Sequence, residues 1–124
     1  MIQRLGFLGV RTASQAAFEA TVALYRDQLR IEPFVDEPAA VWFRAADGSQ
    51  IHVYGPADED HAFFGEAPVV GLVVDDFDAA RSAMVAAGIA FVGEPQQAGD
   101  AVWNHYVGPD GNVYEIIGRA AGDA

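Results

Sequence analysis

The chain has 124 residues, of which 52% are hydrophobic and 11% aromatic, and its formal net charge at pH 7 is -11. This composition excludes a disordered chain, and the length is that of one domain with a real core. The acid excess would repel a phosphate backbone, so we expect no nucleic-acid partner, and no apolar run is long enough to span a bilayer.

The absence of cysteine excludes disulfides, thiolate metal sites and a cysteine nucleophile. The first residues lack the basic-then-apolar form of a signal peptide, so we expect a cytoplasmic protein. The acid excess has two interpretations: it keeps the protein soluble, or it attracts a cationic ligand.

The chain opens with a predicted strand and a predicted helix. Residues 4–10 read as a short apolar strand that two glycines weaken. Thr12 and Gln15 have the spacing of a capping box, which places Thr12 at the N-cap of a helix that runs to about Arg30. An apolar stripe at helical spacing supports this helix: Phe18, Val22, Tyr25 and Leu29.

Three short strands are expected after this helix. Residues 34–35 predict a brief strand, and residues 40–44 and 50–54 predict a hairpin about Asp47-Gly48. A glycine at the second of these turn positions supplies the positive φ that a tight hairpin requires.

Residues 57–67 read as a linker, because glycine, proline and acidic residues crowd together there. We expect His61 in this acidic segment to be solvated. Phe63 and Phe64 need an apolar partner, either in this chain or in another.

The same order of elements then repeats. Residues 69–74 predict an apolar strand, Asp75 or Asp76 caps a second helix, Gly88 ends it, and residues 89–92 predict a short strand. The buried stripe of the second helix comprises Phe77, Ala80 and Met84.

A second hairpin follows, between residues 101–107 and 112–117. Its turn contains Gly108-Pro109-Asp110-Gly111, in which proline presets the first turn residue and Gly111 closes the loop. We expect residues 118–124 to form a frayed tail.

The spacing of equivalent glycines indicates an internal repeat. Gly48 and Gly111 lie 63 residues apart, and Gly9 and Gly71 lie 62 apart. The predicted order is therefore β-α-β-β-β, a linker, and β-α-β-β-β again. Two such modules would each bury one sheet face against a helix, which leaves the other faces to curl around a cavity.

The two hairpins predict which side chains would line that cavity. With symmetric turns, Trp42 lies opposite His52, and His105 lies opposite Glu115. Mostly apolar walls with a few convergent polar groups are typical of a small-molecule site. The predicted ligand-binding residues are Trp42, His52, Trp103, His105 and Glu115, with Gln50 and Tyr54 as further members.

Three segments carry a resemblance to a known family: the Gly108–Asn112 turn running into Glu115, the Val73–Ala80 strand-to-helix join, and the opening Phe7–Val10. Together they resemble the vicinal oxygen chelate superfamily, the glyoxalase, bleomycin-resistance and extradiol-dioxygenase group, over nearly the whole chain.

The resemblance implies an α+β fold of two βαβββ modules with curved mixed sheets forming a cavity. A single domain would then span residues 1–124, with module one at about 1–56, the linker at about 57–67 and module two at about 68–120. The resemblance also implies a homodimer. A dimeric ferredoxin-like α+β fold is the alternative, although it accommodates the two matched hairpins less naturally.

In metal-bearing members of the superfamily, ligands come from the first and last strands of each module. By position, those four places are Phe7, His52, Val69 and Glu115 in this chain. Phenylalanine and valine cannot coordinate a metal, so the usual site is half missing and no cofactor is expected. The chain thus resembles more closely the metal-free members, which bind and sequester a small molecule.

Two main functions compete on this basis. In the first, the chain is a small-molecule binding protein that sequesters a cationic or aromatic compound, with tryptophan rings stacking on the ligand and Glu115 pairing with its charge. The alternative is a divalent-metal-dependent lyase, isomerase or dioxygenase in which His52, Glu115 and His105 hold Fe, Mn, Ni or Zn.

The His105–Glu115 pair has two further interpretations. Without a metal, His105 and Glu115 are candidate catalytic residues that would act together as a general base. They would otherwise form a structural pair. In a third function, the chain is a binding module that serves a biosynthetic pathway without catalysis.

Overall fold

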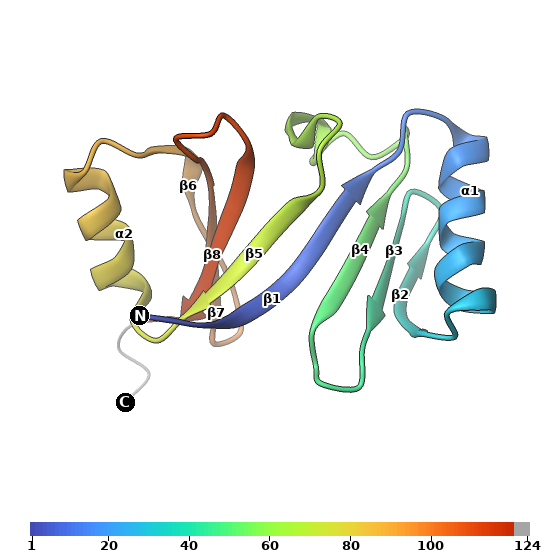
Figure 1. Cartoon of the computed structure of the whole chain (residues 1–124), viewed down its shortest axis with the longest axis horizontal. Helices are drawn as coiled ribbons and strands as arrows, with labels where there is room; N and C mark the ends of the chain where they lie inside the picture. Colours follow the sequence, from blue (N-terminus) through green and yellow to red (C-terminus); the bar gives the residue numbers. More distant parts are fainter. Residues whose placement is uncertain (121–124) are drawn as a thin grey trace. The chain divides into compact units, whose positions relative to one another are not determined.

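The computed structural model describes residues 1–120. Figure 1 shows the elements in chain order. These are β1 (Ile2–Arg11), α1 (Gln15–Ala23), the π-helical turn η1 (Leu24–Gln28), β2 (Glu32–Glu37), β3 (Ala40–Arg44), β4 (Gln50–Tyr54), the short 3-10 helix η2 (Ala62–Phe64), β5 (Val69–Val74), α2 (Phe77–Ala86), β6 (Ala90–Ala98), β7 (Ala101–Val107) and β8 (Val113–Arg119). Within residues 1–120, no helix has the length and apolar character needed to cross a membrane.

The chain forms two compact units. The first unit is Phe7–Pro68, and the second unit combines Met1–Gly6 with the chain from Val69 onward. Strand β1 is therefore divided between them. Each unit contains one β-α-β-β-β run, so the predicted α+β fold of two βαβββ modules with mixed sheets is confirmed.

The sheet of the first unit has the strand order β2-β3-β4-β1. Strand β1 runs parallel to β4, whereas β3 is antiparallel to both of its neighbours. Helix α1 covers one face of this sheet, and every second residue of the strands points toward the helix. The core there comprises Phe18, Val22, Val41, Phe43 and Val53.

The sheet of the second unit repeats this arrangement in the order β5-β8-β7-β6. Strand β5 runs parallel to β8, and β7 is antiparallel to β8 and β6. Its core lies between the sheet and α2 and comprises Val74, Phe77, Ala80, Val102 and Ile116.

The first helix starts later and ends differently from the prediction. Ser14, not Thr12, is the N-cap, and its hydroxyl accepts from the Ala17 N–H at 3.1 Å. The Thr12 hydroxyl instead donates to the Tyr54 carbonyl at 2.8 Å, which fixes the end of β1 to β4. The α-helix stops at Ala23 and continues as the π-helical turn, because Leu29 N–H donates to Leu24 O.

The second helix follows the prediction closely. Asp76 is the N-cap, and its side chain accepts from the Ala79 N–H at 3.0 Å. Gly88 has a φ of 88°, the left-handed conformation that ends a helix most readily at glycine.

Two strands of the second unit are longer than predicted. Strand β6 runs to Ala98, not to Val92, because the pairing register shifts between Val92 and Gln96 and then resumes. Strand β8 reaches Arg119, so the first residues of the predicted tail pair with β7. The rest of that prediction, residues 121–124, lies outside the described residues.

Candidate functional site

The predicted hairpin registers are correct in both units. Trp42 pairs with His52 across β3 and β4, and His105 pairs with Glu115 across β7 and β8. Because successive strand residues alternate, all four side chains lie on the sheet faces that point away from the helical cores.

The first unit carries a cluster of rings on this face, which we call the aromatic face and define as Phe7, Trp42, His52 and Tyr54. The Trp42 and His52 rings stack, with centroids 4.1 Å apart and an interplanar angle of 6°. Phe7 contacts the other side of the imidazole, with the ring centroids 4.9 Å apart.

Both ring nitrogens of His52 have hydrogen-bond partners. Nε2 lies 2.8 Å from Gln50 Oε1, and Nδ1 lies 3.0 Å from the Tyr54 hydroxyl. An amide oxygen only accepts, so Nε2 carries the proton and Nδ1 accepts from the tyrosine. This arrangement fixes the tautomer and leaves neither nitrogen with a free lone pair.

Burial, and to a smaller extent the nearby charge of His61, lowers the pKa of the His52 imidazole from 6.5 to about 3. His52 is therefore neutral at physiological pH. A neutral ring whose lone pair is already occupied orients its neighbours and offers a stacking surface, but it neither shuttles protons nor ligates a metal.

Trp42 is different, because its indole N–H has no hydrogen-bond partner in the part of the chain that the structure describes. Trp42 Nε1 is buried, and no acceptor among residues 1–120 bonds to it. A buried donor without an acceptor costs roughly 1–3 kcal/mol. The atom is thus a candidate contact for an acceptor that a ligand supplies.

The corresponding face of the second unit holds a close pair of a histidine and a carboxylate. His105 Nε2 and Glu115 Oε2 lie 2.7 Å apart, and the two side chains are only 12% and 10% exposed. Trp103 lies on the same face, and its indole N–H donates to Gln96 Oε1 at 3.0 Å. The five predicted ligand-binding residues are thus divided between the units: Trp42 and His52 in the first, and Trp103, His105 and Glu115 in the second.

Sequence reasoning missed the role of His61. Its ring stacks on Tyr54 with centroids 3.8 Å apart, and its Nδ1 lies 3.0 Å from Asp58 Oδ2. The expectation of a solvated histidine is wrong, since the side chain is only 24% exposed. The spacing of three residues between Asp58 and His61 in a turn-rich segment was the available signal.

Phe64 also packs within this chain. It is 4% exposed and packs edge-on against Tyr54, with ring centroids 5.5 Å apart. Phe63 remains 39% exposed beside it. The apolar partner that the sequence called for is therefore internal for Phe64.

The residues at the superfamily's four metal positions do not fit a metal. Phe7 and Val69 offer no donor atom, and both nitrogens of His52 are already bonded. Across residues 1–120, no group of three or more histidines and carboxylates could hold an ion.

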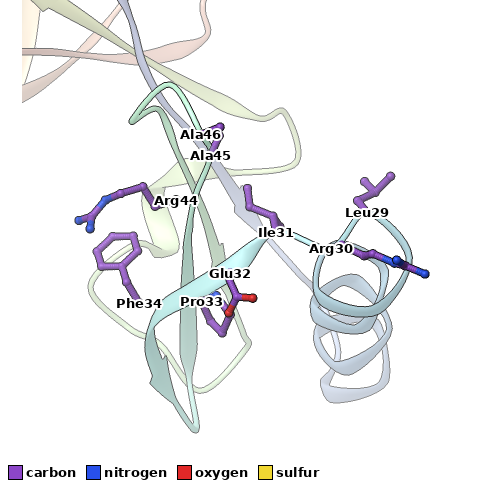
Figure 2. A pocket seen from close by; sticks show the side chains of 9 residues that line it. All are labelled: Leu29, Arg30, Ile31, Glu32, Pro33, Phe34, Arg44, Ala45 and Ala46. Carbon is purple, nitrogen blue, oxygen red and sulfur yellow. The ribbon is translucent and has the colours of Figure 1, made fainter.

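A hollow of about 630 Å³ lies elsewhere in the first unit, between the end of η1 and strand β2 (Figure 2). None of the five predicted site residues lines it. The Arg44 guanidinium lies 4.0 Å from the centre of the Phe34 ring at one side, and Leu29 and Arg30 lie at the other.

Comparison with known proteins identifies the fold. No protein-family model and no curated protein match the chain. Among solved structures, methylmalonyl-CoA epimerase from Streptomyces coelicolor in complex with 2-nitronate-propionyl-CoA is 22% identical, with a TM-score of 0.67 over 98% of this chain and 100% of that chain.

Two further structures show the same likeness. Methylmalonyl-CoA epimerase from Mycobacterium tuberculosis is 18% identical, with a TM-score of 0.67 over 96% of this chain and 89% of that chain. A glyoxalase/bleomycin resistance protein/dioxygenase superfamily member from Vibrio splendidus is 15% identical, with a TM-score of 0.67 over 93% and 97%. The chain has the fold of these three structures, and its resemblance to the vicinal oxygen chelate superfamily is confirmed at the level of the fold.

Proposed function

We propose that the protein is a small-molecule binding protein whose ligand presents a planar or aromatic group to the aromatic face of the first unit. The observation that carries this proposal is the buried Trp42 N–H without an acceptor among residues 1–120. A ligand oxygen or nitrogen would satisfy this donor, and the neighbouring rings of the aromatic face would supply apolar contacts.

The state of His52 supports binding over catalysis at this face. Its ring is neutral, and hydrogen bonds to Gln50 and Tyr54 hold its orientation. Such a fixed, uncharged ring contributes shape and stacking to a binding site, since apolar walls with few polar contacts are typical of ligand sites.

The test compares two tryptophan substitutions. Naphthylethanol is the probe, and isothermal titration calorimetry measures its affinity for the wild type, Trp42→Phe and Trp103→Phe. We expect Trp42→Phe to lose about tenfold in affinity, because one hydrogen bond and part of the stacking surface disappear. Trp103→Phe is the matched control, since its N–H already bonds to Gln96. Equal affinities for all three proteins would refute the proposal.

The second candidate is a metal-free lyase or isomerase that uses His105 and Glu115 for proton transfer. Their contact of 2.7 Å between two nearly buried side chains favours it, because a carboxylate can orient an imidazole as a general base. The matching structures include methylmalonyl-CoA epimerases, so methylmalonyl-CoA is the probe. Solvent deuterium entering the substrate with the wild type, but not with His105→Gln, would establish this activity.

We also propose that the protein forms a homodimer, as the resemblance implies. Sedimentation velocity on the untagged protein tests this directly, and a single species of monomer mass at micromolar concentration would refute it. Phe63, which is 39% exposed, is the variant position, and Phe63→Ser should weaken a dimer that uses this ring.

A further inference from the structure

We infer that the ligand of the proposed site carries a carboxylate group, and that Arg11 binds it. This inference rests on the proposed function and specifies the ligand class. It replaces the expectation of a cationic ligand, because Glu115, the residue expected to hold the cation, is already paired with His105.

Arg11 lies on the same side of the sheet as the aromatic face. It is the last residue of β1 and pairs with Tyr54 on β4, while Gly9, two residues earlier, pairs with His52. Phe7 and Arg11 occupy alternate positions of the same strand, so their side chains leave the same face of the sheet. The rings of that face and the guanidinium are therefore neighbours within one sheet.

Within residues 1–120, the guanidinium of Arg11 lacks an ionic partner. Its Nη2 donates to the Asp58 carbonyl at 3.3 Å, while its Nε is buried without a hydrogen-bond partner among residues 1–120. No carboxylate of the described chain forms an ion pair with it, although the sequence holds 18 acidic residues against 7 arginines.

Two other arginines of the chain have side-chain partners. Arg26 pairs with Asp27, and the Nε of the half-buried Arg81 donates to Asn104 Oδ1 at 2.8 Å. Arg11 differs from both, because its buried Nε has no hydrogen-bond partner among residues 1–120, and a buried donor left unsatisfied is costly; its retention indicates that a ligand supplies the acceptor.

The chemistry of the group favours a carboxylate. A guanidinium presents its N–H groups as a planar fork that matches the two oxygens of a carboxylate. One cation balances one negative charge, and the net charge of -11 disfavours a dianion such as a phosphate monoester.

The sheet geometry also sets the size of the ligand. Trp42 and Arg11 are separated by two strand spacings across the sheet and by two residues along it. At about 4.8 Å per strand and 3.3 Å per residue, their Cα atoms lie roughly 12 Å apart. A ligand that contacts both groups would have to span about this distance, with an acceptor at the Trp42 N–H and its carboxylate at Arg11.

The test uses three probes with the same ring and arm but different charge: naphthylacetate, naphthylethanol and naphthylethylammonium. Calorimetry measures each with the wild type, Arg11→Gln and Arg44→Gln. Arg44 is the matched control, because it is an exposed arginine of the same unit that lies over Phe34. We expect the wild type to bind naphthylacetate about tenfold more tightly than naphthylethanol. Arg11→Gln should abolish that preference, and Arg44→Gln should retain it.

The outcomes separate this inference from the proposed function. If naphthylethanol binds and charge makes no difference, or if the ammonium probe binds best, the inference fails and the binding function stands. If no probe binds, the binding function fails. The anion site is then decided by the melting temperature in acetate against chloride at equal ionic strength, where a larger stabilisation by acetate of the wild type than of Arg11→Gln supports it and equal responses refute it. Should Arg11→Gln not fold, Arg11→Lys replaces it, and it should weaken naphthylacetate because an ammonium lacks the fork.

Discussion

At the scale of single residues, the charge state of His52 follows from its surroundings. Burial removes water from the imidazole, and Gln50 and Tyr54 hold it through both nitrogens. The sequence predicted the partner Trp42 from the hairpin register. It did not predict that the ring is neutral, because that depends on burial and on His61, which lies on a different segment.

This charge state predicts a loss of stability in acid. The pKa of His52 is about 3 in the folded protein and 6.5 when unfolded, so the unfolded chain binds more protons between these values. Stability is complete above pH 6.5 and falls as the pH drops toward 3. From this group alone we expect a loss of roughly 2–3 kcal/mol between pH 7 and pH 4.5.

Urea unfolding at a series of pH values, for the wild type and His52→Gln, measures this term. The carboxylates contribute to both proteins alike, so the difference between the two curves isolates His52. The curves should converge as the pH falls, and parallel curves would contradict the prediction.

Gly9 leaves the space beside His52 that Phe64 occupies. A Cβ built at Gly9 would lie 2.8 Å from Phe64 Cε2 and 2.8 Å from Phe7 Cε2, closer than real contacts allow. We expect Gly9→Ala to lower the free energy of unfolding by about 1–3 kcal/mol. A double-mutant cycle with Phe64→Leu checks the cause, because the smaller side chain should recover part of the loss. Additive effects would show that Phe64 is not the obstacle.

At the scale of elements, the bounds of four strands were the most predictable, and three of these strands belong to the two predicted hairpins. The bounds of β3, β4, β5 and β7 match the predictions residue by residue. Each hairpin combines period-two alternation with an Asp-Gly turn, and both signals are local in sequence.

Two elements were less predictable because tertiary contacts decide them. Glu94 and Pro95 in β6 do not read as strand, yet the strand resumes after an irregularity at which Gly93 has a φ of 70°. Similarly, the end of α1 depends on a π-helical turn rather than on propensity. No pattern of side chains predicts a π-helical turn.

Asn104 holds the irregular part of β6. It is 2% exposed, accepts from Arg81 Nε at 2.8 Å, and donates to the carbonyls of Val92 and Gly93 at 3.3 and 3.4 Å. We expect Asn104→Ala to cost about 2–4 kcal/mol, because buried groups lose their partners. Urea unfolding measures the cost, and amide hydrogen exchange should show β6 losing protection first. Asn112→Ala, at an exposed turn, is the control, and a similar loss there would refute the assignment.

At the scale of the whole molecule, the repeat of glycines and hairpins predicted the fold, because one βαβββ module implied the other. The site was predicted in part. Opposed pairs followed from register, whereas the unsatisfied donors of Trp42 and Arg11 depend on which side chains fail to meet. That information is absent from any local pattern.

The donor set also predicts the metal content of the whole protein. Untagged protein purified without chelator, then offered Mn, Fe, Ni, Co and Zn, should retain well below one ion per chain, because His52 is engaged and Phe7 and Val69 lack donor atoms. Mass spectrometry of the desalted protein measures this. Stoichiometric metal that Glu115→Ala removes would instead favour the metal-dependent enzyme.

The division of β1 between the two units has a consequence for how the protein is made. The ribosome synthesises Met1–Gly6 before Val69, but their unit also needs the later part of the chain, where Asp75 N–H donates to Met1 O at 3.1 Å. The nascent chain can complete Phe7–Pro68 while residues 1–6 still lack the rest of their unit. A gene permuted to begin at Val69 would instead deliver these six residues directly after the rest of their own unit and before Phe7–Pro68.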